Sequence, residues 1–407
     1  MDLGFSFQTS PIRLEKAFAL LNEMSEECGY DFYNFQNMVR ITLCEAGKIF
    51  FYYENGAING ICQSNIGGPG FHAAAIDFID KFETKSKLTV ALDDTTEYHS
   101  HRDFERLKTE FYDWLRDMIE VLSEETKHKS FDNIYFRWNM GEYTPENITN
   151  TVVTPMGRFS VSYLAEQAKE IENLSKEFFL WNSRKIDPLY FRNTALSLLW
   201  VGCCFMPGSR SDDDLEVNHK IIALIRVVIH TDPTIPIPID EYLELCALNN
   251  VEPLPTDNLV EHRSEFPIGY RRGMVQKHVG NLVIPLSGNY LYSVDSGYDV
   301  WYNEAEIGWR IIQTEAYNRD EIGTAFDDIF DKAEEPVESF KIIGGKCNAA
   351  FTGTIEDEED GDIYFQIIAE ILSGTQITLF TIYFDDPEDK ENIMNWLKEI
   401  RANIDDE

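Results

Sequence analysis

The chain has 407 residues, 43% of them hydrophobic and 13% aromatic, and at roughly 100–200 residues per domain it is expected to form two or three domains. This apolar content excludes an intrinsically disordered chain, because disorder requires far fewer residues that can be buried. The net charge of −36, from 71 acidic and 35 basic residues, argues against binding to nucleic acid or to an anionic membrane, since both would repel the chain.

The seven cysteines are an odd number, and most of them stand within apolar runs, as Cys44, Cys62, Cys203 and Cys204 do. With no C-x-x-C motif, buried thiols in a reducing compartment fit best. The N-terminus shows no cationic start followed by an apolar stretch, and no apolar run approaches the ~18 residues of a membrane span. We therefore expect a cytoplasmic protein.

An N-terminal α+β domain with an antiparallel sheet is predicted over residues 1–150. Ser10 followed by Pro11 favours the start of its first helix, and Asn55-Gly56 is typical of a two-residue hairpin turn. Ser100 to Asp103 has the pattern of a capping box before a further helix. Strands are expected at 39–43, 49–53, 88–92 and 134–138.

The stretch around a glycine-rich bend is the clearest strand, turn and helix in the sequence. Gly67, Gly68 and Gly70 end a strand, and an amphipathic helix begins at once. Free N–H groups before a helix can cradle an anion. The bend lacks both the Lys-Ser/Thr of a P-loop and the G-x-G-x-x-G spacing of a dinucleotide site. A tight structural turn is therefore the favoured interpretation.

Histidines near this bend are the other candidates for chemistry. His99 and His101 form an H-x-H pair, and on an extended segment they could supply two ligands to zinc. A solvated loop is the favoured interpretation of the pair, because no third ligand is identifiable. His72 is expected in the first turn of its helix and could act as a neutral base, but no Ser or Cys nucleophile stands near it in the sequence. The candidate site therefore comprises Gly67, Gly68, Gly70, His72, His99 and His101, without a predicted metal or cofactor.

The rest of the chain is predicted to contain a helical segment, a linker and an acidic domain. The helical segment covers residues 151–250, and the proline-containing linker covers 251–278. A C-terminal α+β domain follows over 279–407, as an α/β/α sandwich with an antiparallel sheet. Its helices are expected from Asn318 and from Asp386-Pro387. Its later strands are expected near 338–343, 347–355, 363–371 and 376–384.

The charge of this last part is uneven. Residues 320–407 contain 24 acidic and 6 basic residues, a net charge of −18 and half of the total. The run from Glu356 to Asp362 does not have the EF-hand spacing that calcium binding requires, and it is expected at a charged hairpin tip.

Two resemblances add to this picture. Gly308-Trp309 on an early strand and the stretch from Ile377 to Thr381 before the final helix resemble the PsbP/Mog1-like α/β/α module, over about residues 280–404. Members of that family mostly bind other macromolecules, so the resemblance implies binding without transferring any site. The stretch from Gly68 to His72 with Arg102-Asp103-Phe104 is similar to uncharacterised bacterial proteins linked to toxin–immunity loci, including Tir-chaperone-like modules.

Three function classes remain open at this point. A non-enzymatic interaction factor, immunity-like or chaperone-like, that binds a basic protein is favoured because the acidity is high and no catalytic motif is visible. A hydrolase or metal-dependent enzyme would use the His99/His101 region or the glycine bend. A structural or scaffold protein would carry its acidity for solubility alone.

Overall fold

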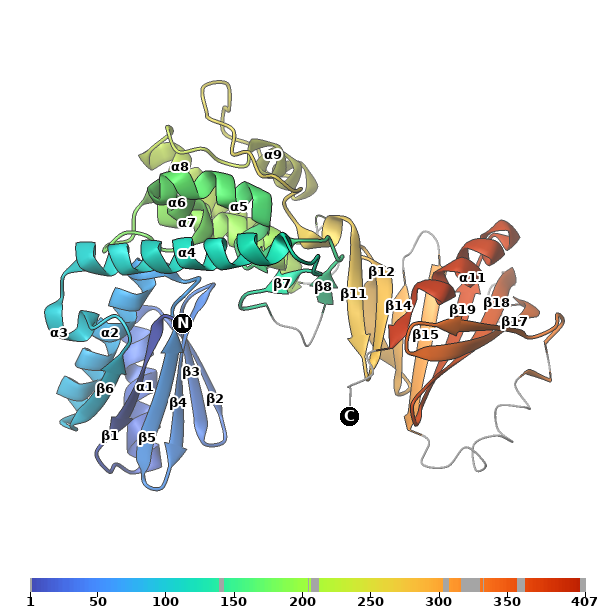
Figure 1. Cartoon of the computed structure of the whole chain (residues 1–407), viewed down its shortest axis with the longest axis horizontal. Coiled ribbons are helices and arrows are strands. Elements are labelled where there is room, and N and C mark those ends of the chain that lie inside the picture. The colour runs from blue at the N-terminus through green and yellow to red at the C-terminus, as the bar shows by residue number, and fades with distance from the viewer. Residues whose placement is uncertain are drawn as a thin grey trace. The chain divides into compact units, whose positions relative to one another are not determined.

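The computed structural model describes residues 2–138, 143–203, 205, 212–302, 307–315, 330–331, 333–356 and 363–402. The chain divides into two compact units (Figure 1). Unit 1 contains residues 1–138 and 147–269, and unit 2 contains residues 139–146 and 270–407. The predicted α+β class is confirmed, since helices and mainly antiparallel sheets make up the described residues.

Unit 1 begins with a six-stranded sheet in the order β2-β3-β4-β5-β1-β6, in which every neighbouring pair is antiparallel. Its strands are β1 (Gly4–Thr9), β2 (Asp31–Phe35), β3 (Met38–Cys44), β4 (Gly47–Glu54), β5 (Ala57–Gln63) and β6 (Val90–Asp94). Helices α1 (Leu14–Cys28) and α2 (Gly68–Ser86) supply core residues to one side of this sheet. Phe51 of β4 points to that side, with its ring centroid 6.4 Å from Phe78 and 6.1 Å from Phe82 of α2.

Two helices of unit 1 begin at other residues than the sequence predicts. Asp103 caps α4 (Phe104–Thr126), because its side chain accepts hydrogen bonds from the backbone N–H groups of Glu105 and Arg106. The capping box expected from Ser100 is wrong, since Ser100 lies inside α3 (Tyr98–His101). The predicted cap at Ser10 is also wrong, because α1 begins only at Leu14.

The remainder of unit 1 is mostly helical. Residues 151–160, predicted as helical, instead form β9 (Thr151–Thr154) and β10 (Gly157–Ser160), which join β7 (Ile134–Tyr135) in a three-stranded sheet. The helices are α5 (Val161–Gln167), η1 (Ala168–Glu170), α6 (Ile171–Phe178), α7 (Pro188–Ser197), the π-helix η2 (Leu198–Gly202), α8 (Asp212–Thr231) and α9 (Ile239–Leu248). Buried residues of α7, α8 and α9 form a hydrophobic cluster of their own.

The segment predicted as a linker, 251–278, divides between the two units of the structure. Residues 251–269 belong to unit 1, where the backbone N–H of His262 donates to Ile237 at 2.7 Å. After η3 (Tyr270–Arg272), residues 274–278 belong to strand β11 and so lie in a sheet.

Unit 2 contains two antiparallel sheets. The smaller has the order β20-β12-β11-β8, with β8 (Tyr143–Pro145), β11 (Met274–Val279), β12 (Leu282–Ser287) and β20 (Arg401–Ala402). The larger has the order β13-β14-β15-β19-β18-β17-β16. Its strands are β13 (Leu291–Asp295), β14 (Tyr298–Tyr302), β15 (Ile307–Glu315), β16 (Glu338–Ile342), β17 (Gly345–Glu356), β18 (Ile363–Ser373) and β19 (Gln376–Phe384).

The final helix of unit 2 lies close to its prediction. Asp386 caps η4 (Pro387–Asp389), and α11 (Lys390–Glu399) buries Ile393 and Leu397 in the core of the unit. The helix predicted from Asn318 and the acidic run over 357–362 lie essentially outside the described residues.

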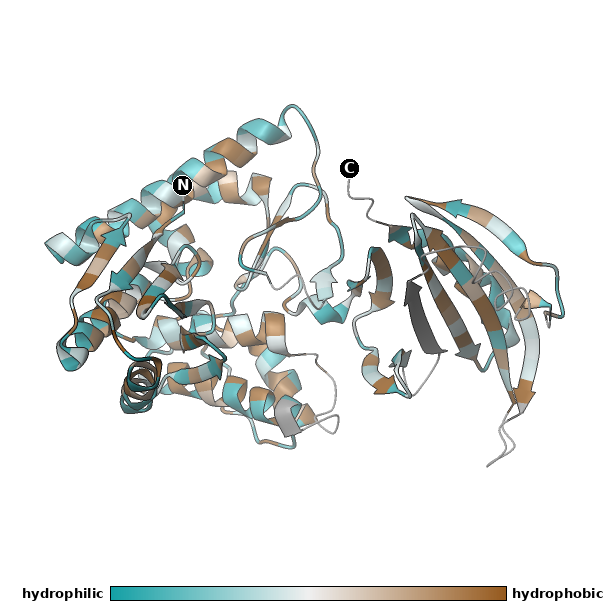
Figure 2. Ribbon diagram, turned by 90° about the horizontal axis from the view of Figure 1, so that it is seen from below, coloured by the Kyte–Doolittle hydropathy of each residue, from teal (hydrophilic) through white to brown (hydrophobic). Residues whose placement is uncertain are grey.

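Helices in the described part of the chain combine hydrophilic and hydrophobic stretches (Figure 2). Across those described residues, none of them has both the length and the apolar character needed to cross a lipid bilayer.

Candidate functional site

The glycine bend at the start of α2 is filled by the backbone that follows α6. The N–H of Gly70 donates to the carbonyl of Trp181 at 2.9 Å, and the N–H of Trp181 donates to Gly67 at 3.0 Å. Gly68 has a φ of +88°, and a Cβ added to it would lie 2.6 Å from the carbonyl oxygen of Trp181. The N–H of Gly70, which could have faced an anion, is thus engaged within the protein.

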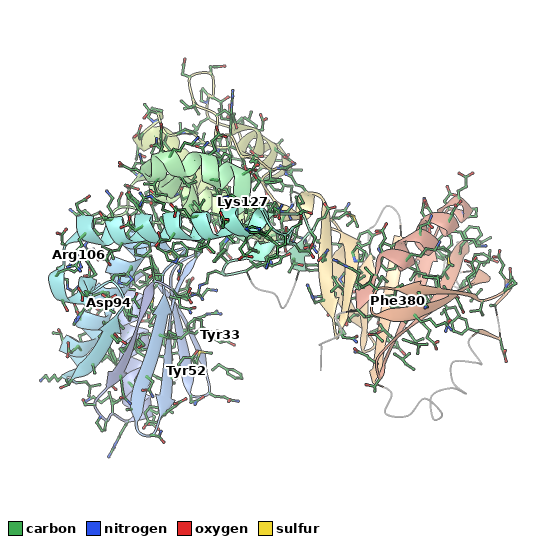
Figure 3. The ribbon with its side chains drawn as sticks, viewed as in Figure 1. Tyr33, Tyr52, Asp94, Arg106, Lys127 and Phe380 are labelled. Atoms are coloured by element: carbon green, nitrogen blue, oxygen red, sulfur yellow. The ribbon has the colours of Figure 1, made fainter. Side chains whose placement is uncertain are left out.

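His72 lies on α2 beyond this bend and is completely buried. Its Nδ1 is 2.8 Å from Ser64 Oγ, and its Nε2 is 3.2 Å from Asp94 Oδ1. Thr96 Oγ1 also lies 3.2 Å from Nε2 and donates to Asp94 at 2.9 Å. The histidine therefore connects the end of β5 with the end of β6, where Figure 3 labels Asp94.

These contacts change the pKa of the Asp94 carboxyl group. Burial raises its pKa, but the hydrogen bond and charge interaction with His72 and the backbone N–H groups of His99 and Thr96 outweigh that effect. The pKa of Asp94 is therefore held below its ordinary value of 3.8.

Ser64, His72 and Asp94 form a connected Ser–His–Asp set, but the serine contacts Nδ1 and the aspartate contacts Nε2, the reverse of the pairing in the serine-protease triad. Sequence reasoning did not connect Ser64 with His72, although Ser64 lies eight residues before it. Ser64 and His72 have no exposed surface, and the side chain of Asp94 is 3% exposed. The network links two strands and a helix through buried side chains, and a catalytic serine must be reached by its substrate.

His99 and His101 do not converge on a common point. They lie on the short helix α3, neither in the solvated loop that was favoured nor on the extended segment that a zinc site would have used. His99 Nε2 is 3.4 Å from Asp80, whereas His101 is within hydrogen-bond distance of the Thr96 carbonyl and the Asp103 N–H. Within the described ranges, no group of three or more His, Cys, Asp or Glu residues could hold a metal ion.

The side of the N-terminal sheet opposite Phe51 presents aromatic side chains at its surface. We call this surface the open face and define it by Tyr33, Phe35, Arg40, Phe50, Tyr52 and Ile61. Four of these side chains are substantially exposed: Tyr33 (48%), Phe35 (53%), Tyr52 (36%) and Ile61 (42%). Tyr33 and Tyr52 are labelled in Figure 3.

The strand register arranges the open face as a continuous row. Tyr33 stands opposite Arg40, Arg40 opposite Phe50, and Phe50 opposite Ile61. The guanidinium of Arg40 lies over the ring of Tyr33 at 4.8 Å from its centroid, and the rings of Phe50 and Tyr52 stack at 6.4 Å. Exposed aromatic and arginine side chains in one cluster are typical of protein-binding surfaces.

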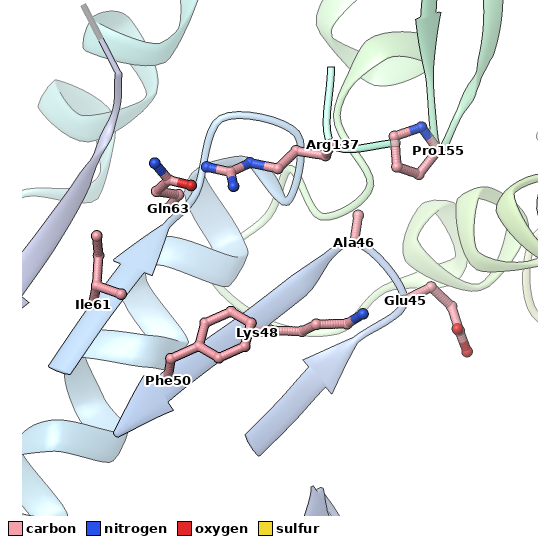
Figure 4. Close-up of a pocket in the computed structure, with 8 residues that line it drawn as sticks. All are labelled: Glu45, Ala46, Lys48, Phe50, Ile61, Gln63, Arg137 and Pro155. Atoms are coloured by element: carbon pink, nitrogen blue, oxygen red, sulfur yellow. The ribbon is translucent and has the colours of Figure 1, made fainter. Parts of the chain in front are cut away.

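A hollow of about 170 Å³ opens beside Phe50 and Ile61 (Figure 4). We call it the cationic hollow, because Lys48 of β4 and Arg137 line it together with Gln63 of β5. Glu45, the one acid among its described lining residues, forms an ion pair with Lys220 at 2.7 Å.

Two of these cations are affected by their surroundings. Burial and the charge of Arg40 lower the pKa of Lys48 from 10.5, against a weaker opposite effect of Glu45. Burial also lowers the pKa of Arg137 from 12.5.

Sequence reasoning missed both the open face and the cationic hollow. The run from Ile49 to Tyr53 consists only of apolar and aromatic residues, so its sequence shows no alternation. The two sides of the strand become visible only in the structure, where Ile49 and Phe51 are fully buried and Tyr52 is exposed.

Comparisons with known proteins add little to this description. The chain matches no known family profile and no curated protein. Among solved structures it is similar to a protein from Bacteroides thetaiotaomicron VPI-5482, determined at 1.50 Å resolution, with 13% identity. That similarity covers 33% of this chain and 46% of the other, and its TM-score of 0.23 supports no argument about fold or function.

Proposed function

We propose that this chain is a non-enzymatic interaction factor that docks a protein partner on the open face. The observation that carries the proposal is the row of exposed aromatic side chains beside Arg40 on one side of an ordered sheet. Tyr and Arg are enriched among the residues that contribute most to protein interfaces. A two-residue anchor such as Tyr33 and Tyr52 would offer rigid apolar area at a low entropic cost.

The partner that fits the whole chain is a protein of net positive charge. A net charge of −36, half of it within residues 320–407, would accelerate the encounter with such a protein and repel an acidic one. The resemblance to PsbP/Mog1-like modules agrees with a binding role. The resemblance to toxin–immunity proteins makes a basic toxin domain the expected kind of partner, with this chain as its immunity-like or chaperone-like factor.

A hydrolase is the second candidate, and the distances within Ser64, His72 and Asp94 favour it. It ranks second because substrate has no path to Ser64 Oγ in this structure. A fluorophosphonate probe tests it directly. Labelling of Ser64 in the native protein, lost in Ser64→Ala, would support a hydrolase, and an unlabelled protein would speak against it.

The interaction proposal is tested by affinity capture from an extract of the native host at low and moderate salt. Three baits are compared: the native chain, the double variant Tyr33→Thr/Tyr52→Thr, and the control Tyr292→Thr. Threonine keeps a high β propensity, and Tyr292 lies on a strand of unit 2 with 49% exposure, similar to that of Tyr33.

We expect a protein of high isoelectric point that the native and Tyr292→Thr baits retain. The double variant should bind it at least about thirtyfold more weakly, the equivalent of about 2 kcal/mol. Capture of no protein, or equal capture by all three baits, would contradict the proposal. Dimerisation of the purified chain that the double variant abolishes would assign the open face to self-association instead.

A further inference from the structure

We propose that the cationic hollow is a binding site for a single oxyanion group, a phosphate or a carboxylate. The two charged side chains that would hold the oxyanion are Lys48 and Arg137, with the amide of Gln63 as a third polar group. The site goes beyond the proposed docking function, since it needs only a small anion to be occupied.

The charges around the hollow are the first argument. In a chain with twice as many acidic as basic residues, a recess lined by lysine and arginine would ordinarily contain a carboxylate. Among the described residues that line the hollow, Glu45 is the only carboxylate, and its Oε1 is 2.7 Å from the Nζ of Lys220. The charges of Asp2 on Arg137 and of Glu45 on Lys48 are weaker effects than burial, so positive charge remains available for a ligand.

The repulsion among these cations is the second argument. Lys48 and Arg137 keep substantial exposed surface, so an ion from solvent can reach both, and partial burial lowers the pKa of each. Arg40 on the neighbouring strand adds a repulsive charge to Lys48, and its own Nε is buried without a hydrogen-bond partner. An oxyanion would relieve the repulsion and supply charge-assisted hydrogen bonds.

The geometry of Arg137 is the third argument. Its backbone has a φ of +60°, a conformation that costs a non-glycine residue free energy and that occurs often at ligand sites. In Figure 4 the guanidinium of Arg137 extends toward Gln63, while the amine of Lys48 extends toward Glu45 and Ala46 at the edge of the hollow. The volume of about 170 Å³ accommodates one such group rather than a nucleotide.

The chemistry can come from two sources, a free phosphate ion or a carboxylate side chain of a bound protein. Titration calorimetry with inorganic phosphate and with N-acetylglutamate amide at constant ionic strength distinguishes them. The variants are Lys48→Gln and Arg137→Gly, the second of which suits the positive φ, and the control is Lys16→Gln. Lys16 is exposed on α1, so its substitution changes the net charge by the same amount.

We expect at least one probe to bind the native chain and Lys16→Gln equally. Lys48→Gln and Arg137→Gly should each weaken that binding about tenfold to a hundredfold. NMR of the lysine side chain should also show the pKa of Lys48 rising when the probe is bound. Phosphate binding alone identifies a free-ion site, and binding of the glutamate probe alone identifies a side-chain carboxylate as the ligand.

Absence of binding by both probes, or binding that Lys48→Gln leaves unchanged, would overturn the anion site. Neither outcome bears on capture of a partner by Tyr33 and Tyr52. Failure of this proposal and failure of the docking proposal are therefore distinguishable.

Discussion

Gly70 is a position where the bend tolerates no side chain. A Cβ there would lie 2.3 Å from the ring of Trp181 and 2.4 Å from the carbonyl oxygen of Ser183, and backbone cannot move aside cheaply. We expect Gly70→Ala to lower the free energy of unfolding of unit 1 by about 1–3 kcal/mol in urea denaturation. Gly202→Ala is the control, because its Cβ would make only an ordinary contact of 3.5 Å with Val217. Equal stability of the two variants would contradict this account of the bend.

Asp94 contributes stability that depends on pH. Its folded-state pKa lies below the ordinary value of 3.8, so the unfolded chain binds the proton more readily. The contribution is therefore fully present above about pH 4 and is lost as pH falls further. We expect Asp94→Asn to reduce this acid-side loss while lowering stability at pH 7 by about 2 kcal/mol. Urea denaturation between pH 3 and pH 7 measures both effects.

The control for this experiment is Asp117→Asn, which removes an exposed carboxylate from α4. Its pH profile should match that of the native chain. An Asp94→Asn profile parallel to the native one would show that the contacts with His72 have no effect on the proton equilibrium.

The contacts of His72 with Ser64 and Asp94 could not be predicted from the sequence. Its contact with His72 spans eight residues, and the contact of His72 with Asp94 spans twenty-two. No short motif describes such a set, because β1 lies between β5 and β6 in the sheet. His99 and His101, by contrast, form an H-x-H pair that could indicate a zinc site, but their side chains contact different partners.

His262 ties the segment after α9 to two helices of unit 1. Its Nδ1 accepts a hydrogen bond from Arg192 of α7 at 3.1 Å, and Glu177 of α6 lies 3.5 Å away. Burial, opposed by Glu177 and assisted by Arg192, lowers the pKa of His262 to about 4. Stability should therefore be fully present above pH 6.5 and decline as pH falls toward 4, by roughly 3 kcal/mol in total.

Replacing His262 by glutamine should flatten the stability profile between pH 4 and 6.5, as measured by the urea midpoint of unit 1. His128→Gln is the control, since His128 is 74% exposed at the end of α4. The account of this contact fails if both variants keep the native slope.

At the scale of elements, the periodicity of apolar residues predicted helices and strands better than short motifs predicted the contacts of single residues. The apolar residues Leu107, Phe111 and Leu115 of α4 are fully buried, because a 3.6-residue repeat places them on one face of the helix. Strands β16 to β19 of unit 2 were also predicted within a few residues, whereas β11 was not, because its first residues fall in the predicted linker. The open face was not predicted, because which side of a sheet the helices cover depends on contacts far apart in the chain.

At the scale of the whole molecule, the charge should control how fast a basic partner binds. Once the partner is purified, its association rate should fall as salt rises, because charges are screened over about 8 Å at physiological ionic strength. Asp385→Asn/Glu391→Gln should slow association more than Asp117→Asn/Glu120→Gln, although both pairs remove two exposed carboxylates. An association rate independent of salt would remove the physical basis for steering by residues 320–407.

The most direct test of the central claim is hydroxyl-radical footprinting of the chain with and without the captured partner. Oxidation of side chains reports which side of the sheet is covered. We predict that Tyr33, Phe35 and Tyr52 become strongly protected in the complex, while Tyr292 is oxidised at its free rate. Unchanged oxidation of Tyr33 and Tyr52 in a complex known to be formed would show that the open face is not the docking surface.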